Sequence, residues 1–266
     1  MTTLDQVADA LARSRRYRSL DAALLRRVAG EALAAGGGER EALKRAKRAL
    51  HQAAGAYRGD RPHYARVCEE LRAAAQVGER ALREALQTAL ARHASSRERL
   101  PVLEPLYAQI FERTGRPASL LDLACGLNPL ALPWMGLAAD VRYSAVDIDL
   151  ELLELVATAL GLLGVEVRTA VADLAVHTPA ESVELALLLR SWTVLEHQRP
   201  GRGLALLREL DCPRVVVSFP TRSLGGRERG MRSNYARDFE AALGAEPWRV
   251  ERLELASELV YLVDKR

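Results

Sequence analysis

The sequence predicts an α/β protein in which an all-α N-terminal part precedes a seven-stranded sheet that ends in an antiparallel hairpin. Two observations carry this prediction. From residue 119 onward, short apolar runs alternate with amphipathic helical stretches, which is typical of a parallel sheet covered by helices on both faces. Before residue 101, apolar residues recur only at helical spacing.

The first hundred residues read as helices throughout. Helical spacing is clear in LDQVADALA, LDAALLRRVAGEAL and VCEELRAAAQVGERALREALQTALARH. Breaks fall at Gly36–Gly38 and near residues 55–62, so two helical subdomains divided at the second break are an alternative to one. Residues 1–100 carry 20 Lys and Arg against 12 Asp and Glu, whereas residues 101–266 carry a net charge of −5. This asymmetry suggests a polyanion-binding module joined to a catalytic one, with a solvated arginine-rich surface as the alternative.

Five apolar, β-prone runs follow, each separated from the next by a stretch such as LELLELVATALGLLG. They are SLLDLAC at 119–125, RYSAVDI at 142–148, VEVRTAV at 165–171, ELALLLR at 184–190 and RVVVSFP at 214–220. The chain then ends in VERLEL and ELVYLV with a short break between them, which predicts a hairpin. Five β/α units followed by such a hairpin are the pattern of the class I (Rossmann-like) methyltransferase fold rather than of a sheet with six parallel strands.

Several features narrow the class of protein. No apolar run reaches the roughly 18 residues that a membrane span needs, and the N-terminus has no apolar core of a signal peptide. The three cysteines, Cys68, Cys125 and Cys212, are widely spaced and form no CxxC pair. We therefore expect neither a disulfide framework nor a metal site, and a reducing, cytoplasmic environment.

The turn after the first strand carries the first candidate site, DLACGLNP. Open α/β sheets bind ligands at the carboxyl ends of their strands, and small residues there let the backbone approach the ligand. The turn lacks both the GxGxxG of a dinucleotide site and the GK[ST] of a phosphate loop. This suits S-adenosylmethionine, a cofactor without phosphate. We expect Asp122, Ala124, Cys125 and Gly126 at the cofactor site.

Acidic residues follow the next two strands. Asp147, in AVDID, is placed to accept both ribose hydroxyls, and Asp173, in VADL, to accept the adenine amino group. Ile148 would then lie against the adenine ring. Each aspartate could instead cap the following helix, but two at consecutive strand ends favour a nucleoside site. Asp149 is the better candidate for a plain helix cap.

The sequence indicates the acceptor of the methyl group less clearly than the cofactor. Methylation of base amino groups usually requires an [ND]-P-P-[YF] turn after the fourth strand, where this chain has Arg190, Ser191, Trp192 and Thr193. Methylation of pyrimidine C5 requires a cysteine nucleophile, and no cysteine is placed for that. A ring nitrogen with a free lone pair, such as guanine N7, needs neither.

Five segments together resemble one known family. They are HASSRERLP, LLDLACGLNPLALPWM, AVDID, LLLRSWTVLE and SFPTRSLGGRERGM. This pattern, spread along essentially the whole chain, resembles the aminoglycoside-resistance 16S rRNA (guanine(1405)-N7)-methyltransferases of the Arm, Kgm and Rmt type. The pairing of DLACGLNP with FPTRSLGGR is far more specific to that family than the general class I pattern.

The resemblance implies S-adenosylmethionine-dependent methylation of a decoding-site guanine at N7 within the 30S subunit, and resistance to drugs of the kanamycin and gentamicin type. Residues 1–100 would bind rRNA, and residues 101–266 would form the methyltransferase domain. We expect a monomer with neither a DNA nor a membrane partner. Two other readings remain: another RNA or small-molecule methyltransferase, and a non-catalytic module that binds adenosylmethionine or RNA.

The resemblance also implies roles for single residues. Arg99 would bind the methionine carboxylate, with Arg97 as the alternative, and Arg190, Glu196 and Arg227 would be catalytic at the acceptor pocket. Trp192 would either stack on the flipped base or lie in the core. The expected RNA-binding residues, with Tyr17 as a stacking group and with Gly225 and Gly226 as hinges of the FPTRSLGGRERGM loop, are Arg15, Arg16, Arg18, Lys44, Arg45, Lys47, Arg48, Arg222 and Arg229.

Overall fold

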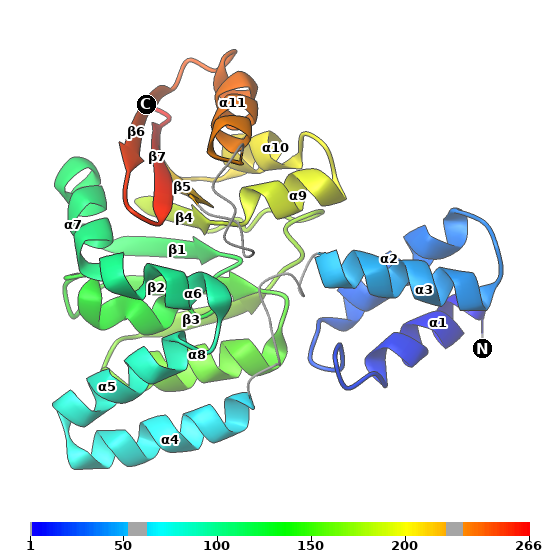
Figure 1. Ribbon diagram of the computed structural model, residues 1–266, viewed down its shortest axis with the longest axis horizontal. Helices are drawn as coiled ribbons and strands as arrows, with labels where there is room; N and C mark the ends of the chain where they lie inside the picture. Colours follow the sequence, from blue (N-terminus) through cyan, green and yellow to red (C-terminus); the bar gives the residue numbers. More distant parts are fainter. Residues whose placement is uncertain (1, 53–62, 222–230) are drawn as a thin grey trace.

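The predicted mixed sheet is present. A computed structural model describes residues 2–52, 63–221 and 231–266, and in it seven strands form one sheet in the order β3-β2-β1-β4-β5-β7-β6 (Figure 1). The first five strands run parallel, and β7 runs antiparallel to both β5 and β6. The strand bounds are β1 (Ser119–Leu123), β2 (Arg142–Asp147), β3 (Val167–Val171), β4 (Leu185–Leu189), β5 (Arg214–Pro220), β6 (Arg249–Glu254) and β7 (Glu258–Asp264). The class I methyltransferase topology is thereby confirmed.

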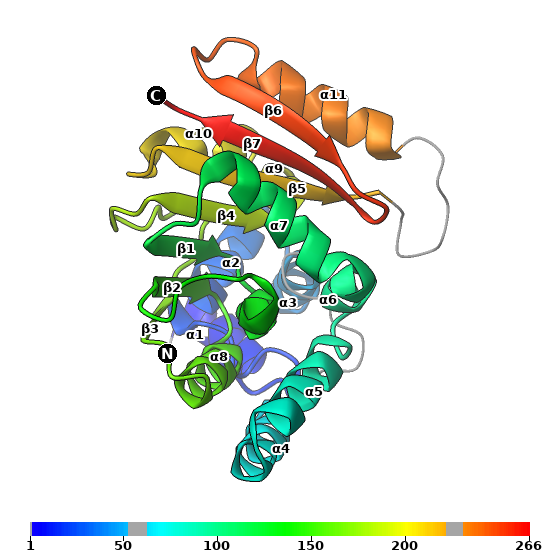
Figure 2. The same ribbon diagram turned by 90° about the vertical axis from the view of Figure 1, so that its left-hand side faces the viewer.

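Two hydrophobic cores lie on the two faces of the sheet. Successive side chains of a strand point to opposite faces, so Leu187 of β4 joins one core and Leu188 the other. Because both faces of the central strands are buried, their sequences are mostly apolar, and β4 (LALLL) is apolar throughout. One face is covered by α7 (Leu103–Thr114), α8 (Leu150–Leu162) and the 3-10 helix η3 (Asn128–Trp134), and the other by α9 (Trp192–Gln198), α10 (Arg202–Glu209) and α11 (Met231–Leu243) (Figure 2).

Strand β3 is the exception to this burial. It forms one edge of the sheet, and its residues from Arg168 to Val171 are exposed. Arg168 pairs there with Glu181, with 3.6 Å between the nitrogen and oxygen atoms.

The N-terminal helices divide into two groups. Helices α1 (Thr3–Ala12), α2 (Ala22–Ala34) and α3 (Glu39–Leu50) enclose a hydrophobic core of their own, and we call this group the lobe. In contrast, α4 (Tyr64–Val77) and α5 (Glu79–Leu90) pack on α8 and η3 as part of the core on one face of the sheet. Helix α6 (Ala94–Arg99) and the 3-10 helix η2 (Leu100–Val102) then lead into α7.

The lobe lies beyond the carboxyl ends of the parallel strands (Figure 1). It is attached there through an isolated bridge between Leu20 and Asp149, in the loop that follows β2. The carboxylate of Asp149 also accepts hydrogen bonds from the backbone N–H groups of Glu151 and Leu152, which confirms the predicted cap of α8. No helix in the described part of the chain is long and apolar enough to cross a membrane.

Candidate functional site

A pocket opens at the carboxyl ends of β1, β2, β3 and β4, next to the lobe. All of the expected cofactor residues except Asp122 line it. The lining residues are Leu24, His93, Ser95, Arg99, Ala124, Cys125, Gly126, Leu127, Asp147, Ile148, Ala172, Asp173, Leu174, Ala175, Leu189, Arg190, Ser191, Val194, Leu195 and Gln198. The sheet topology therefore brings together residues from helices α2, α6 and α9 and from four strand ends.

The turn after β1 is tightly folded against the end of β2. Ala124 and Gly126 both have left-handed backbone conformations, with φ of 49° and 52°. Such a conformation disfavours a residue with a Cβ by roughly 1–2 kcal/mol, so its occurrence at Ala124 marks a backbone shape that the site requires. The N–H of Gly126 donates to Oδ2 of Asp147 at 3.0 Å, while Oδ1 of Asp147 accepts from the N–H groups of Ile148 and Asp149. These bonds fix the orientation of the Asp147 carboxylate at the pocket wall.

Arg99 is the clearest anion-binding group in the pocket. Its side chain is buried, yet its only hydrogen bonds among the described residues go to the carbonyl of Ser95 and to Oδ1 of Asn128, both at 3.3 Å. No described carboxylate forms an ion pair with it, although a buried charge without a counter-ion is unfavourable. A carboxylate of a bound ligand would satisfy it. Arg97, the alternative, is exposed and does not line the pocket.

Asp122 does not line the pocket and is linked to the lining residue Arg99 through Asn128. Its Oδ2 accepts from Nδ2 of Asn128 at 2.8 Å and from the Tyr143 hydroxyl at 2.7 Å, whereas its Oδ1 has no described partner. Asn128 in turn accepts from the Tyr107 hydroxyl and from Arg99. Burial raises the pKa of Asp122 to about 7, against the opposing effect of its hydrogen bonds. Sequence reasoning missed Asn128, although a polar residue before the proline of this turn is a usable signal.

Arg190 follows β4 with a φ of 59° and is only 3% exposed. Its guanidinium donates to the carboxylate of Glu258 through Nε at 2.8 Å and to Glu98 through Nη1 at 2.6 Å. The remaining oxygen of Glu258 accepts from the Ser218 hydroxyl. The two carboxylates raise the pKa of Arg190 further, against the effect of burial, so this side chain stays protonated and does not shuttle protons. Because Glu98 precedes Arg99 in α6, the ion pair also anchors the helix that carries Arg99.

Neither Glu196 nor Trp192 lines the pocket. The carboxylate of Glu196 accepts from the N–H groups of Gly201 at 2.8 Å and Gly203 at 2.7 Å, since the first N–H groups of a helix lack partners within it. Trp192 is 4% exposed and packs edge-on against Phe239, with ring centroids 4.7 Å apart, so it lies in the core rather than being free to stack on a base.

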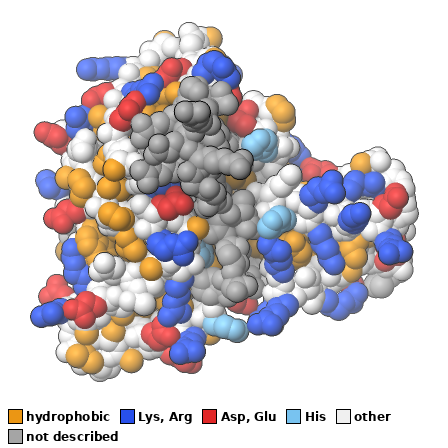
Figure 3. All heavy atoms as spheres, viewed as in Figure 1, with side chains coloured by type: hydrophobic (Ala, Val, Ile, Leu, Met, Phe, Trp, Pro, Cys, Tyr) orange, Lys and Arg blue, Asp and Glu red, His pale blue; other side chains and the backbone are white. Residues whose placement is uncertain are grey.

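The expected RNA-binding residues of the N-terminal part lie on the lobe. Those with exposed side chains are Arg15, Arg16, Arg18, Lys44, Lys47 and Arg48. Lys and Arg side chains gather on the face of the lobe seen in Figure 3. Arg45 differs, because its guanidinium donates to the carbonyl of Ala32 and so holds the end of α2.

Tyr17 is not available as a stacking group, and that expectation is wrong. Its ring is 5% exposed within the lobe core, and its hydroxyl donates to the carbonyl of Lys47 at 3.1 Å. Arg222, Arg227 and Arg229, with the glycines of the FPTRSLGGRERGM loop, lie outside the described residues.

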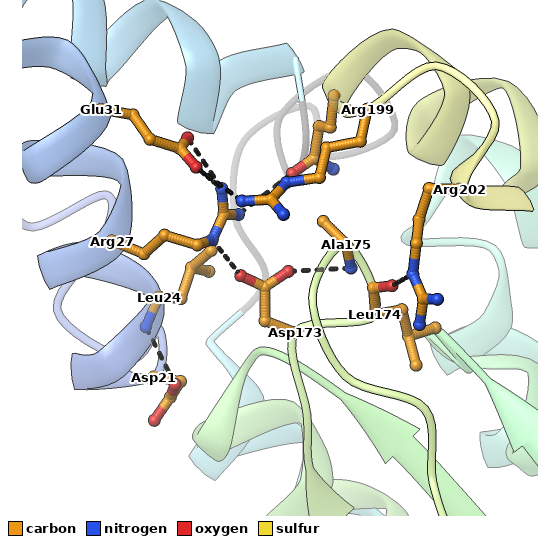
Figure 4. A network of polar contacts seen from close by, with 10 residues as sticks. Asp21, Leu24, Arg27, Glu31, Asp173, Leu174, Ala175, Arg199 and Arg202 are labelled. Atoms are coloured by element: carbon orange, nitrogen blue, oxygen red, sulfur yellow. Dashed lines mark hydrogen bonds and ion pairs between the residues drawn. The ribbon is translucent and has the colours of Figure 1, made fainter. Parts of the chain in front are cut away.

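The lobe supplies residues to the site that the sequence did not reveal. Leu24 of α2 lines the pocket, and Arg27, one turn later on the same helix, donates to the carboxylate of Asp173 (Figure 4). On the other side, Val194, Leu195 and Gln198 of α9 complete the wall.

The buried ion pair leads to a stability prediction. Arg190→Ala should lower the free energy of unfolding by about 3–5 kcal/mol, because it leaves the fully buried carboxylate of Glu258 without its partner. The double variant Arg190→Ala/Glu258→Ala should lose clearly less than the sum of the two single variants. Urea unfolding measures all three values, and strict additivity would contradict the coupling.

Asp122 should make stability depend on pH. Its pKa is raised from 3.8 to about 7 by folding, so between these values the native state holds the proton more tightly than the unfolded state. The free energy of unfolding should therefore fall as pH rises through this window, by at most about 1.4 kcal/mol per pH unit. Asp122→Asn lacks this titration, so its stability relative to the wild type should increase from pH 5 to pH 8. Parallel urea-unfolding profiles of the two proteins would refute this.

Comparison with known proteins identifies the family. Residues 13–262 match the family model described as "Ribosomal RNA methyltransferase (FmrO)". The chain is 43% identical to a 16S rRNA (guanine(1405)-N(7))-methyltransferase of Micromonospora echinospora over 98% of this chain and 97% of that one. It is 45% identical to the protein of that name from Frankia casuarinae, over 98% and 93%. The crystal structure of the 16S rRNA methyltransferase RmtF in complex with S-adenosyl-L-homocysteine superposes with a TM-score of 0.85 at 36% identity, covering 100% of this chain and 99% of that one. The protein belongs to the FmrO family of ribosomal RNA methyltransferases.

Proposed function

We propose that the protein transfers the methyl group of S-adenosylmethionine to N7 of guanine 1405 of 16S rRNA in the 30S subunit. Resistance to aminoglycosides of the kanamycin and gentamicin type follows from that modification. One observation supports this most directly: a single pocket holds the carboxylates of Asp147 and Asp173 together with the buried guanidinium of Arg99, which has no carboxylate partner among the described residues. These groups match the amino-acid carboxylate, ribose and adenine of the cofactor, and two relatives named for this activity share at least 43% of their residues with the chain over nearly its whole length.

The residues of the pocket suit this cofactor. Arg99 would pair with the methionine carboxylate, Asp147 would accept from the ribose hydroxyls, and Ile148 would lie beside the adenine ring. The left-handed turn at Ala124 and Gly126 brings the backbone, rather than side chains, next to the ligand. When bound, the cofactor supplies an electrophilic methyl group on its sulfonium.

The task of the chain is then to align the acceptor and exclude water. Guanine N7 carries a free lone pair, so no side chain has to remove a proton from it, and positioning accounts for most of the rate gain. This agrees with the state of Arg190, which is charged, neutralised by two carboxylates and locked into the pocket wall. Arg190 would act as a positioning residue for α6 and Arg99. The proposed roles of Arg227 at the acceptor and of Arg222 and Arg229 at the RNA rest on the sequence alone.

The lobe would bind the ribosomal RNA. Its exposed Arg16, Lys44, Lys47 and Arg48 supply charge for phosphate contacts, and recognition of a folded rRNA site is mostly by shape. The target guanine would be turned out of its stack to reach the pocket. Methylation at N7 would place a positive charge where a polycationic drug binds, and like charges repel. We expect a monomer to act on the assembled subunit.

The proposal is tested with the whole protein. Expression in a kanamycin-sensitive host should give resistance, and purified 30S subunits treated with the protein and S-adenosylmethionine should show borohydride–aniline cleavage at guanine 1405. Full drug sensitivity at good expression, or methylation at another nucleotide, would refute the assigned target.

Arg99→Ala should weaken the binding of S-adenosylhomocysteine by at least about tenfold, because it removes a buried, charge-assisted hydrogen bond to the ligand carboxylate. Arg97→Ala provides the matched control, since Arg97 lies on the same helix with an exposed side chain. Isothermal titration calorimetry measures both affinities. If both variants bind like the wild type, the carboxylate site is elsewhere.

Reversing the charge of Lys44 and Lys47 should weaken 30S binding and lower its dependence on salt concentration, by about one unit of the log–log slope for each phosphate that the variant no longer neutralises. The control, Arg142→Glu/Arg249→Glu, changes the net charge equally at the amino ends of β2 and β6, which lie at the opposite end of the strands from the lobe. Binding isotherms over a salt series compare the two. An equal effect of both double variants would show that only net charge matters.

A further inference from the structure

We infer that helix α2 of the lobe forms a wall of the cofactor pocket, with Arg27 as a positioning residue for its adenine end, and that cofactor binding and docking of the lobe are therefore coupled. This inference rests on the proposed function, because it takes S-adenosylmethionine as the ligand. Figure 4 shows the network that carries it.

The first contact joins the lobe to the loop after β3. Nε of Arg27 donates to Oδ2 of Asp173 at 2.6 Å, and the other carboxylate oxygen accepts from the N–H of Ala175 at 3.1 Å. The two side chains are only 17% and 8% exposed, so solvent screens this ion pair far less than a surface pair. Asp173 thus takes its orientation from a residue 146 positions earlier in the chain.

Arg27 also contacts the opposite wall of the pocket. Its Nη1 donates to Glu31 at 2.8 Å, and its Nη2 lies 3.4 Å from Oε1 of Gln198, a residue of α9 that lines the pocket. Glu31 accepts in turn from Arg199 at 3.0 Å. The planar guanidinium therefore links three elements at once, α2, the loop after β3 and α9, and each of them contributes a residue to the pocket lining.

A second, independent attachment involves the loop after β2. The N–H of Asp21 donates to the carbonyl of Ile148 at 2.9 Å, and the N–H of Leu150 donates to the carbonyl of Ser19 at 2.8 Å. The Ile148 side chain packs against the hydrophobic core of the lobe, while Leu24 reaches into the pocket itself. Both loops that carry the nucleoside-binding aspartates are thus held by the lobe.

Cofactor binding and docking of the lobe are coupled because the same residues take part in both. A ligand that contacts Asp173, Ile148 and Leu24 favours the arrangement in which these residues lie together, and that arrangement is the docked lobe. By reciprocity, anything that fixes the lobe strengthens ligand binding by the same factor. Since the lobe also carries the exposed basic residues, a cofactor-loaded protein would present them to the RNA in a fixed orientation.

The test uses full-length protein and S-adenosylhomocysteine. Arg27→Gln should weaken its binding by about tenfold, as expected when one charged, largely buried hydrogen-bonding partner at the pocket is removed. Arg26→Gln is the matched control, because Arg26 is the next residue on the same helix but is 56% exposed and pairs with Asp5 inside the lobe. Its affinity should stay within about twofold of the wild type. Equal affinities of Arg27→Gln and wild type would overturn the inference.

Hydrogen–deuterium exchange tests the coupling in the wild-type protein itself, so its result does not depend on whether a variant folds. In the wild type, S-adenosylhomocysteine should slow exchange in α1 and α3, which do not line the pocket, as well as in α2. In Arg27→Gln, shown to be folded by its melting temperature, the slowing in α1 and α3 should shrink. Unchanged exchange throughout the wild-type lobe would overturn the coupling, whereas failure of the wild type to bind the ligand at all would overturn the proposed function instead.

Discussion

The guanidinium of Arg190 joins three parts of the chain at the end of the pocket that contains Arg99. Its two carboxylate partners, Glu98 and Glu258, come from a helix before the sheet and from the last strand of the sheet. Two features of Arg190 are unfavourable for folding. Its charge is buried with that of Glu258, and its backbone has a left-handed conformation. The ion pair with Glu98 fixes the position of α6. This helix also carries Arg99, whose guanidinium has no carboxylate partner among the described residues.

At the end of the pocket that contains Asp173, a second arginine–carboxylate pair joins distant parts of the chain. There the charged pair is Arg27 with Asp173, and the contributing helix belongs to the lobe. At both ends, therefore, a residue from the first hundred positions fixes a residue of the methyltransferase sheet through an arginine–carboxylate pair. The sequence divides near residue 100 into a basic segment and an acidic one, but residues of both segments line the pocket.

Much of this could be predicted from the sequence, because the relevant signals are local. The runs that form β1, β4 and β5 are mostly apolar and buried, the turn after β1 follows directly from a strand end, and Asp147 is the last residue of β2. Long-range contacts could not be predicted. Tyr17 lies among arginines in the sequence but is buried by packing within the lobe. Likewise, Glu196 accepts hydrogen bonds from the N–H groups of Gly201 and Gly203 because the chain turns back after α9.

Arg26 and Arg27 show most directly why side-chain contacts could not be predicted from the sequence. The two are identical in type and adjacent on one helix, and no local pattern separates them. Docking of α2 on the loop after β3 brings Arg27 to Asp173, whereas packing of α1 against α2 within the lobe brings Arg26 to Asp5. Such a difference is a property of tertiary structure, and no sequence window centred on these residues contains it.

Strand β3 forms an exposed edge of the sheet. An open edge invites pairing with a strand of another chain, and short length and a charged side chain both disfavour such pairing. Strand β3 has five residues, and the Arg168 side chain, held by Glu181, stands on it. Both features disfavour pairing of this edge with another strand, and the loop that follows β3 contacts the lobe through Asp173 and Arg27.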